Sequence, residues 1–325
     1  MPPLTRSSFT PLKRLKESDH GGQNSGIYLV RNAHTHRTAI EKRLPRSAVA
    51  RGLAAREARA MQQCAHPNII RLLFFDPDCK RTGYASLFLP RCELGSLDRL
   101  TANFATRRCE IPEGWLWKVL WDVALALCYL QRGVDARESA QLGRPIGRAE
   151  KAAGWNGIAH RDVKPANIFL TWNGGHADAR YPTAVLADFG GCISLSDMAA
   201  KPPQEAKELS LWTRAFEPPE APRFSDASDA YSLALGVHCM ALLREVPCED
   251  KVLLRERPVG AGGRYSGFLE GVLRRCLREG WRERPDAAYL PYLVWREMER
   301  AAGWAKGRGE RGAAAFARLP EWAFE

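Results

Sequence analysis

The chain has 325 residues, of which 45% are hydrophobic and 26% are charged. This balance is typical of a folded globular protein and excludes a disordered or collagen-like chain. At about 150 residues per domain, the length suggests two packed units or one two-lobed domain. No apolar run reaches the roughly 20 residues that cross a bilayer, and the N-terminal segment lacks the apolar stretch of a secretory signal. We therefore expect an intracellular protein, cytoplasmic or nuclear, without a membrane partner.

Lys and Arg number 48 against 37 Asp and Glu, which gives a net charge of +11. The basic residues are scattered along the sequence, so the pattern favours a solvated surface over nucleic-acid binding as a primary role. Nine cysteines occur without a C-x-x-C pair. Neither a disulfide framework nor a ribbon-type zinc site is indicated, and most of the cysteines are expected to be reduced, buried thiols.

The N-terminal third is rich in predicted strands. Residues 1–14 are interpreted as a basic, polar leader outside the core. An Ala- and Arg-rich stretch with helical spacing, residues 47–64, is predicted as a helix that ends before His66-Pro67. Four short β-branched or apolar runs are predicted as strands, the first two of them forming a hairpin: residues 27–31, 38–42, 69–75 and 85–89.

Beyond residue 96 the pattern becomes helical. Residues 115–131 are apolar on all sides and predict a buried helix, and residues 228–243 predict a second one. Between them, residues 132–156 are polar and Gly-rich, which indicates a surface insertion. Solvated padding is favoured there over a partner site. Two strands, residues 168–171 and 183–187, flank a WNGG turn. Residues 301–325 are interpreted as a Gly/Arg-rich tail outside the core.

One motif dominates the sequence. Residues 160–167 read HRDVKPAN, and Asp188-Phe189-Gly190 follows 21 residues after Asn167. The chain here resembles the eukaryotic protein kinases, specifically their serine/threonine branch. The resemblance implies an α+β bilobal kinase fold over residues 15–300. A small antiparallel N-lobe with one helix would span residues 15–90 and a mainly helical C-lobe residues 91–300, with ATP and Mg²⁺ bound between the lobes.

The resemblance assigns roles within this motif. Phosphoryl transfer requires positioning and charge neutralisation more than covalent chemistry. Asp162 would be the catalytic base that accepts the proton of the substrate hydroxyl. Lys164 would steady the transferred phosphate. Asn167 and Asp188 would be the magnesium ligands, because Mg²⁺ prefers hard oxygen donors.

The family also uses a strand lysine that pairs with a helix glutamate. Lys42 is the expected lysine and Glu57 its expected partner. Glu41 occupies the position before the lysine, and Arg43 follows as a second cation. Because side chains alternate along a strand, Ile40 and Lys42 share a face that Glu41 and Arg43 do not. Ile40 and Lys42 are therefore predicted to face the nucleotide.

The glycine-rich loop over the phosphates is the weakest match. If Gly26 is the third glycine, Gly21 is the first; if Ile27 takes the valine position, Gly22 is the middle glycine and Ser25 the third. The register stays open, and at least one glycine is lost in either case. Gly21, Gly22, Gly26 and Ile27 are all candidates for nucleotide contact.

The hinge between the lobes is placed at residues 89–92. Leu89 would be the gatekeeper, the carbonyl of Pro90 would accept a hydrogen bond from adenine, and the N–H of Cys92 would donate one. Proline lacks an N–H, but only its carbonyl is needed at this place. Adenine recognition by the backbone is therefore expected to survive the proline.

Further matches concern support and regulation. Glu220 is expected to form a buried ion pair with Arg284, Thr213 to contact the catalytic base, and Asp229 to hold the catalytic loop. In the family, an arginine such as Arg161 often pairs with an activation-loop phosphate. Ser194, Ser196 and Ser210 are the candidate acceptors for an upstream kinase, with Ser210 preferred. The alternative is a loop ordered without phosphate by its own Glu205 or Glu208.

Together these residues predict a protein serine/threonine kinase that uses ATP and Mg²⁺ to phosphorylate a protein substrate. The alternative is a catalytically weak pseudokinase that serves as a binding scaffold. That alternative is motivated by the incomplete glycine loop, by Glu41, and by Pro218 in place of the alanine of the family's A-P-E motif.

Overall fold

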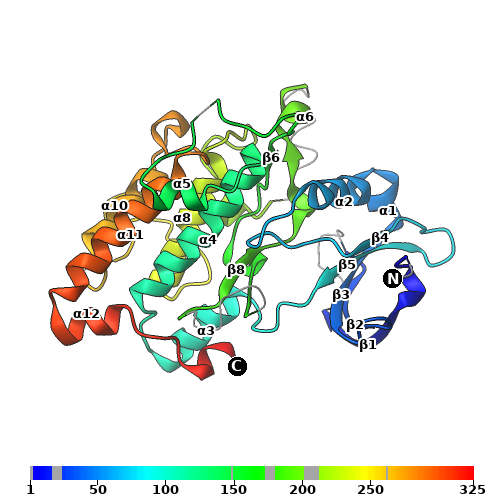
Figure 1. Cartoon of the computed structure of the whole chain (residues 1–325), viewed down its shortest axis with the longest axis horizontal. Coiled ribbons are helices and arrows are strands. Elements are labelled where there is room, and N and C mark those ends of the chain that lie inside the picture. The colour runs from blue at the N-terminus through cyan, green and yellow to red at the C-terminus, as the bar shows by residue number, and fades with distance from the viewer. Residues whose placement is uncertain (1–2, 17–23, 148, 173–179, 201–211, 261–262) are drawn as a thin grey trace. The chain divides into compact units, whose positions relative to one another are not determined.

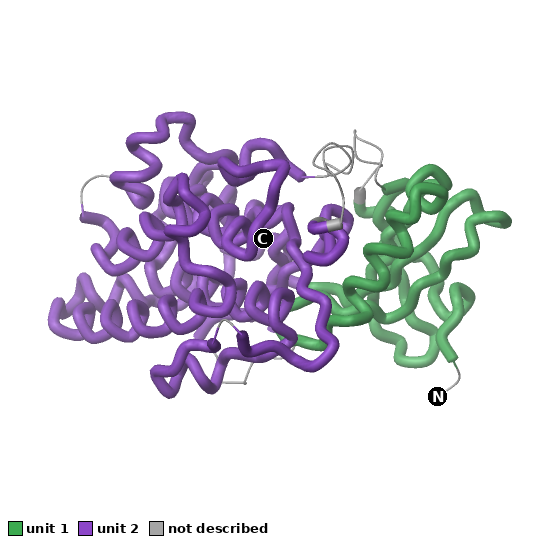
Figure 2. The backbone as a smooth tube through the Cα atoms, turned by 90° about the horizontal axis from the view of Figure 1, so that it is seen from above, with its two compact units in different colours: residues 1–92 green, residues 93–325 purple. Residues whose placement is uncertain are grey.

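The chain forms two compact units, residues 1–92 and residues 93–325 (Figure 2). The computed structural model describes residues 3–16, 24–147, 149–172, 180–200, 212–260 and 263–325. The first unit is a small antiparallel sheet with helices, and the second is mainly helical (Figure 1). The predicted α+β kinase-like architecture of two lobes is confirmed. The division falls after Cys92.

The sheet of the first unit has five strands in the order β1-β2-β3-β5-β4. Its strands are antiparallel throughout, so neighbouring strands place directly opposed side chains on the same face. The unit contains η1 (Arg6–Ser8), β1 (Phe9–Lys16), β2 (Gly26–Asn32), β3 (Thr38–Pro45), α1 (Arg46–Ala50), α2 (Leu53–Gln63), β4 (Phe74–Asp76) and β5 (Tyr84–Pro90).

The hairpin of β2 and β3 was predicted, and its turn has a local cause. The side-chain oxygen of Asn32 accepts hydrogen bonds from the backbone N–H groups of His34 and Thr35, an arrangement that favours a tight turn. The single helix predicted over residues 47–64 is instead α1 and α2, separated at Gly52, whose φ is 71°. The strand predicted over residues 69–75 is also wrong in extent, because only Phe74–Asp76 pairs with β5.

The leader predicted for residues 1–14 is wrong. Residues 9–16 form β1, which pairs with β2 at one edge of the sheet. The Phe9 ring is 6% exposed and stacks on Phe88 with 4.1 Å between ring centroids, in a cluster with Val30 and Ala39. Most other β1 side chains are exposed, because β1 is an edge strand that contributes only the Phe9 ring to the core. The sequence consequently shows little hydrophobic alternation.

The second unit is built around helices that pack on α4, with α8 and α11 its main neighbours. Two short antiparallel pairs of strands, β6 with β9 and β7 with β8, lie on either side of the catalytic-loop sequence, because β6 precedes it and β7 follows it. Its helices are α3 (Leu97–Arg107), α4 (Glu113–Arg132), α5 (Arg137–Gln141), α6 (Leu195–Ala200), α8 (Ser228–Ala241), α9 (Lys251–Glu256), α10 (Gly267–Cys276), α11 (Leu290–Lys306) and α12 (Gly309–Ala315). The strands and short 3₁₀ turns are β6 (Ile158–Ala159), η2 (Pro165–Asn167), β7 (Ile168–Thr171), β8 (Thr183–Leu186), η3 (Phe189–Gly191), β9 (Ile193–Ser194), η4 (Arg214–Phe216), η5 (Trp281–Glu283) and η6 (Glu321–Phe324).

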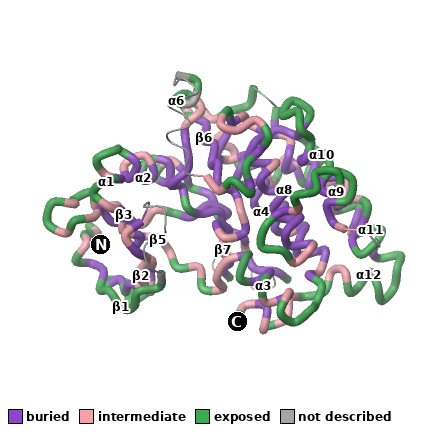
Figure 3. The backbone as a smooth tube through the Cα atoms, turned by 180° about the vertical axis from the view of Figure 1, so that it is seen from behind, coloured by how far each residue is buried: buried purple, intermediate pink, exposed green. Residues whose placement is uncertain are grey.

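Helix α4 forms the centre of the second unit, as its all-round apolar sequence predicted (Figure 3). Trp115 and Trp117 are fully buried. The helix ends at Gly133, which has a φ of 70°, and a Cβ there would lie 2.5 Å from the Trp155 ring. Both the left-handed backbone and the close approach of the ring require glycine at this position.

The segment 132–156, which was predicted to be a surface insertion, buries several of its side chains. Ala140 in α5 is 1% exposed, and α5 lies against α11. Ile146 is also buried, and the Trp155 indole N–H donates to the carbonyl of Leu130 at 3.0 Å. The polar composition hid this packing because only a few widely spaced side chains are buried.

The tail predicted for residues 301–325 also packs on the second unit. Helix α11 continues to Lys306, α12 follows, and η6 lies against α3. The Trp322 ring lies 4.7 Å from that of Phe104, and the amide of Asn103 donates to the carbonyl of Ala323 at 3.2 Å. The interpretation of this segment as lying outside the core is therefore wrong, since Ala301, Ala305 and Ala323 are each at most 4% exposed.

Burial accounts for the state of several cysteines. Burial raises the pKa of the thiols of Cys128, Cys239 and Cys276 to about 12. These thiols are therefore packing groups and not reactive ones. In the described part of the chain no helix is long and apolar enough to span a membrane.

Candidate active site

The loop that follows β6 is held from beneath by one buried carboxylate. Asp229 Oδ2 accepts from the backbone N–H of His160 at 2.7 Å, and Oδ1 accepts from that of Arg161 at 2.8 Å. Burial raises the pKa of the Asp229 carboxyl, and the interaction with His160, including the hydrogen bond from its backbone N–H, offsets part of that shift. Burial also lowers the pKa of the His160 ring. The His160 ring lies edge-on to Phe189 at 5.0 Å. These contacts fix the loop backbone immediately before Asp162.

The Asp162 carboxylate is oriented by three donors. Its Oδ2 accepts from Lys164 Nζ and from Asn167 Nδ2, each at 2.8 Å, and its Oδ1 accepts from the Thr213 N–H at 2.9 Å. Lys164 Nζ also donates to Thr213 Oγ1 at 2.5 Å. An ionised carboxylate offers about four acceptor sites, so three donors fix the group and leave capacity for a fourth proton donor. The structure thus brings Asp162, Lys164, Asn167 and Thr213 together.

Asn167 and Asp188, the two residues expected to bind magnesium, both carry side-chain oxygen atoms of the kind that Mg²⁺ takes as ligands. The Asn167 amide nitrogen donates to both the carbonyl and the carboxylate of Asp162, which leaves its oxygen out of these bonds. Asp188, at a φ of 63°, is exposed and lies one residue beyond Ala187, whose N–H donates to the Asn167 carbonyl at 2.9 Å. An amide oxygen and a carboxylate fit Mg²⁺, which keeps waters and takes phosphate oxygens as further ligands. Among the described residues, no cluster of three or more His, Cys, Asp or Glu side chains could hold a metal ion.

Arg161 is surrounded by groups that the sequence analysis did not anticipate. Its Nε donates to the Gly191 carbonyl at 2.6 Å, and its guanidinium lies 5.6 Å from the ring centroids of both Trp212 and Phe224. The residue is 2% exposed and has a φ of 68°. The signal that could have revealed Trp212 is its position directly before Thr213. The predicted phosphoacceptor Ser210, like Glu205 and Glu208, lies outside the described residues.

The expected buried ion pair is present. Arg284 donates to both carboxylate oxygens of Glu220, at 2.8 and 2.9 Å, and its side chain has no exposed surface. Ser228 Oγ adds a third hydrogen bond to Glu220 at 2.6 Å. The bidentate pair ties the segment after Thr213 to the residue that follows η5, and the hydrogen bond from Ser228 ties the same carboxylate to α8.

In the first unit, Lys42 and Glu57 meet as the sequence predicted. Lys42 Nζ lies 2.8 Å from Glu57 Oε1, and the two side chains are 8% and 4% exposed. Lys42 comes from β3 and Glu57 from α2. Because this buried pair joins the helix to the sheet, it fixes the position of the ammonium group. Lys42 lies opposite Ile27 and Leu87 in the neighbouring strands, so its side chain is on the same face of the sheet as theirs.

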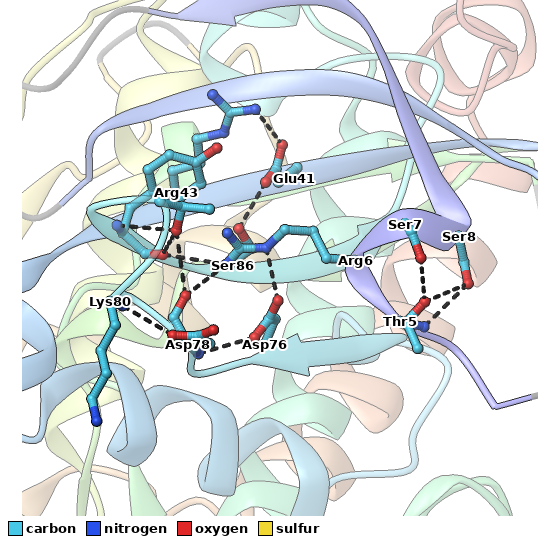
Figure 4. A network of polar contacts seen from close by, with 12 residues as sticks. Thr5, Arg6, Ser7, Ser8, Glu41, Arg43, Asp76, Asp78, Lys80 and Ser86 are labelled. Atoms are coloured by element: carbon cyan, nitrogen blue, oxygen red, sulfur yellow. Dashed lines mark hydrogen bonds and ion pairs between the residues drawn. The ribbon is translucent and has the colours of Figure 1, made fainter.

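Glu41 and Arg43 lie on the opposite face, in a separate network (Figure 4). Glu41 Oε2 accepts from Arg43 at 2.9 Å, and its Oε1 accepts from Ser86 Oγ at 2.7 Å. The Arg43 guanidinium lies 3.7 Å from the ring centroid of Tyr28. The unusual Glu41 is therefore a satisfied structural carboxylate, and Arg43 is engaged away from Lys42.

The structure describes most, but not all, of the other residues of this unit that were predicted to contact the nucleotide. The register of the strands places Ile27, Ile40 and Leu89 on the same face of the sheet as Lys42. Gly26 begins β2 with a φ of 122°, a conformation that favours glycine. Pro90 ends β5, and Cys92 follows at the end of the unit. Gly21 and Gly22 lie outside the described residues.

Comparison with known proteins agrees with this geometry. The family model described as "Protein kinase domain" matches residues 21–256. The G2-specific protein kinase nim-1 of Neurospora crassa is 26% identical over 238 residues, 69% of this chain and 26% of that protein. The G2-specific protein kinase nimA of Emericella nidulans is 25% identical, covering 72% of this chain and 33% of its own length. The serine/threonine-protein kinase TOS3 of Saccharomyces cerevisiae is 25% identical over 57% of this chain and 30% of its own. This chain spans about a quarter to a third of the length of these relatives, and it belongs to the protein kinase family.

Proposed function

We propose that the chain is an ATP-dependent protein serine/threonine kinase that transfers the γ-phosphoryl group to a Ser or Thr hydroxyl of a protein substrate. The observation that carries this proposal is the fixed carboxylate of Asp162, held by Lys164, Asn167 and the Thr213 N–H. Because the donor is an intracellular nucleotide, the cytoplasm or the nucleus is the expected compartment.

Asp162 acts as the catalytic base in this proposal. The substrate hydroxyl donates its hydrogen bond to the acceptor site that the three donors leave open. Orientation of the hydroxyl oxygen toward the phosphorus is the main contribution, since phosphoryl transfer depends on alignment and charge stabilisation. Asn167 and Thr213 keep the carboxylate from rotating, and Asp229 holds the backbone that carries it.

The cations of the site neutralise phosphate charge. Lys164, 21% exposed at its side chain, bridges Asp162 and Thr213, and it is proposed to contact the transferred group. Lys42, positioned by Glu57, is proposed to contact the α- and β-phosphates. Asn167 and Asp188 would hold Mg²⁺, which when bound supplies charge neutralisation at the phosphate oxygens. Gly21, Gly22, Gly26, Ile27, Ile40, Leu89, Pro90 and Cys92 remain the proposed nucleotide contacts.

The Ser/Thr preference rests on Thr213 and Lys164. These residues form one hydrogen-bonded cluster with the base and so narrow the space in which an acceptor hydroxyl can lie. TOS3, which is similar to this chain over 57% of its length, carries serine/threonine kinase in its name.

The experiment is transfer of labelled γ-phosphate from ATP to a generic basic protein, followed by acid hydrolysis and separation of the phosphoamino acids. We expect Mg²⁺-dependent formation of phosphoserine or phosphothreonine. Phosphotyrosine as the main product would contradict the proposed specificity.

A second measurement separates an enzyme from a scaffold. ATP with Mg²⁺ should raise the melting temperature, since a ligand that binds only the folded state stabilises it. Stabilisation without any transfer, from protein treated with an upstream kinase as well, would favour the pseudokinase alternative. A melting temperature insensitive to ATP would contradict nucleotide binding altogether.

A further inference from the structure

A cavity of about 480 Å³ lies in the second unit between the end of α10, the start of α11 and the segment that follows α5 (Figure 1). Its volume is within the range of about 300–1,000 Å³ that is typical of ligand pockets. None of the described residues that line it belongs to the proposed nucleotide, metal or acceptor site. The cavity is therefore separate from the phosphoryl-transfer machinery.

The segment 132–156 supplies one wall of this cavity, through Pro145 and Ile146. Gly143 follows α5 with a φ of 75°, and its N–H donates to the Ala140 carbonyl at 3.0 Å, which makes a left-handed helix end that reverses the chain. Ile146 is then 5% exposed in the wall. Because α5 lies against α11, the segment is fixed to the helix on the other side of the cavity.

The buried part of the lining is apolar. Ile146, Pro285 and Leu293 are buried residues without a side-chain polar group, and they form the floor of the cavity. The half-buried Tyr289 lines it beside them. A hydrophobic side chain that reaches this floor leaves water without depriving a polar group of its partner.

Two of the three arginines in the lining are already neutralised. Arg278 lies 3.1 Å from Glu283, which also lines the cavity. Arg284 is held by both carboxylate oxygens of Glu220, and its side chain has no exposed surface. These arginines are committed to partners within the fold.

Arg275 is different, because it is exposed and the described residues give its guanidinium no carboxylate partner. The preceding Arg274 has one, Glu256, at 2.9 Å. The remaining carboxylate of the lining, Asp286, is 7% exposed and accepts from the Tyr289 N–H at 2.9 Å, so it also serves the fold. The cavity thus offers one uncompensated guanidinium, a group that pairs well with carboxylates.

We infer that this cavity binds a segment of a partner protein in which a hydrophobic side chain lies next to Asp or Glu. The hydrophobic side chain occupies the floor, and the carboxylate pairs with Arg275. Recognition of acidic motifs by arginine is an established mode of peptide binding. Nucleic acid fits less well, because its affinity comes from neutralising several phosphates and the cavity offers one uncompensated cation.

The test is fluorescence anisotropy with the whole chain and labelled peptides that contain no Ser, Thr or Tyr. The probe peptide has one leucine flanked by aspartates on both sides. Alanine replaces the leucine in a second peptide, and lysines replace the aspartates in a third. We expect the probe peptide to bind about tenfold more tightly than the alanine peptide, because it fills an apolar pocket. The lysine peptide should bind at least as weakly as the alanine peptide. Equal Kd values for the three peptides, or no binding by any of them, would overturn the inference.

Two neighbouring arginines of α10 locate the charged contact. Arg275→Gln should raise the Kd of the probe peptide about threefold, the contribution of an exposed ion pair. Arg274→Gln removes the same charge from the same helix but lies outside the cavity, so it should leave the Kd unchanged. Equal losses in the two variants would show that the overall charge attracts the peptide, and would contradict the assignment.

Two aromatic residues locate the apolar contact. Tyr289→Ala removes a ring from the lining, so the advantage of leucine over alanine in the peptide should fall to about twofold or less. Trp304→Ala, at an exposed position of α11 outside the cavity, should keep the full advantage. Melting temperatures confirm that both variants are folded. An unchanged advantage in Tyr289→Ala would contradict the assignment.

Two further measurements separate this site from the proposed activity and from general attraction to anions. Asp162→Asn should bind the probe peptide with the wild-type Kd, so the result does not depend on phosphoryl transfer; loss of binding in that variant would place the peptide at the active site and overturn the inference. Unlabelled oligothymidylate, at a phosphate concentration equal to that of the peptide aspartates, should not displace the peptide. Displacement would identify a general polyanion surface and would equally overturn it.

Discussion

Lys42 Nζ lies 2.8 Å from Glu57 Oε1, and both side chains are less than a tenth exposed. The neighbouring cation Arg43 is on the opposite face of β3, bound to Glu41 and stacked on Tyr28. Two adjacent cations in one strand therefore have different roles, and alternation along the strand separates them.

Lys42→Met should abolish phosphoryl transfer, whereas Arg43→Met should retain most of it. The first variant removes the proposed phosphate contact, and the second removes a group on the other face of the sheet. Initial rates of label transfer from ATP, with circular dichroism to confirm folding, provide the measurement. A loss of transfer in Arg43→Met with full retention in Lys42→Met would reverse the assignment.

Stability gives an independent check on the same pair. Lys42→Met leaves the Glu57 carboxylate buried without its lysine, and removing one partner of a buried pair costs about 3–5 kcal/mol. Adding Glu57→Gln should restore much of the free energy of unfolding but none of the activity. Denaturant unfolding of both variants measures this. A double variant that is less stable than Lys42→Met would contradict the interpretation.

Glu220→Gln should destabilise the protein by about 3–5 kcal/mol, because the Arg284 side chain has no exposed surface and would lose a charged partner. The exposed pair of Arg274 and Glu256 is the matched control. Glu256→Gln should change the free energy of unfolding by less than about 1 kcal/mol. Similar losses in the two variants would show that burial does not set the strength of the Glu220 pair.

Thr213→Val should lower kcat about tenfold or more, because Lys164 loses one hydrogen bond, and bonds to charged groups contribute about 1.5–3 kcal/mol. The backbone N–H of residue 213 remains for Asp162. Thr213→Ser restores the hydroxyl and should keep nearly full activity. Steady-state kinetics of both variants test the assignment, and equal kcat values would exclude a role for the hydroxyl.

His238 predicts how stability depends on pH. The buried ring uses both nitrogens, with Nδ1 donating to the Pro258 carbonyl and Nε2 accepting from the Cys248 N–H at 3.2 Å. Burial lowers the pKa of His238 below its ordinary 6.5; the hydrogen bond to the Pro258 carbonyl offsets part of this shift, and the charge of Arg244 adds to it. A proton on Nε2 would also remove the acceptor of the Cys248 N–H and place two donors against each other. The folded state therefore requires the neutral imidazole.

The sign of the pH effect follows from proton binding. Below about pH 6.5 the imidazole binds a proton in the unfolded chain but stays neutral in the folded chain. The free energy of unfolding therefore falls as the pH falls, by at most about 1.4 kcal/mol per pH unit for this group. His160, whose pKa burial also lowers, adds to the same trend. His238→Gln should make the decline between about pH 6.5 and 5 shallower, and His36→Gln, at an exposed site, should not. Identical slopes in all three proteins, measured by denaturant unfolding, would contradict this.

The sequence predicted the parts of the molecule in which local pattern and chemistry coincide. The alternation of Ile40, Glu41, Lys42 and Arg43 assigned each side chain to a face of β3, and the pairing register agrees. The motif from His160 to Asn167 placed two nitrogen donors, from Lys164 and Asn167, beside the Asp162 carboxylate. In both cases the spacing of residues close together in the sequence was sufficient for the prediction, because the contacts depend on residues only a few positions apart.

Other parts depend on contacts between distant residues, which no local pattern encodes. Phe9 is the main buried ring of an otherwise exposed strand, so β1 reads as a polar leader until its contact with Phe88 is known. Trp322 reaches Phe104, more than 200 residues away, from a Gly- and Arg-rich segment. The surroundings of Arg161 likewise require Trp212 and Phe224, which lie 51 and 63 positions later in the numbering.

The most direct test of the central claim compares the wild-type protein with Asp162→Asn. Asparagine keeps the size of the side chain and one acceptor oxygen but cannot take the hydroxyl proton. With folding and ATP affinity unchanged within about twofold, transfer to a protein substrate should fall by a factor of about 10² or more. Asp197→Asn, on the exposed surface of α6, should transfer label at the wild-type rate. Equal transfer by Asp162→Asn and the wild-type protein would contradict the role of Asp162 and the mechanism built on it.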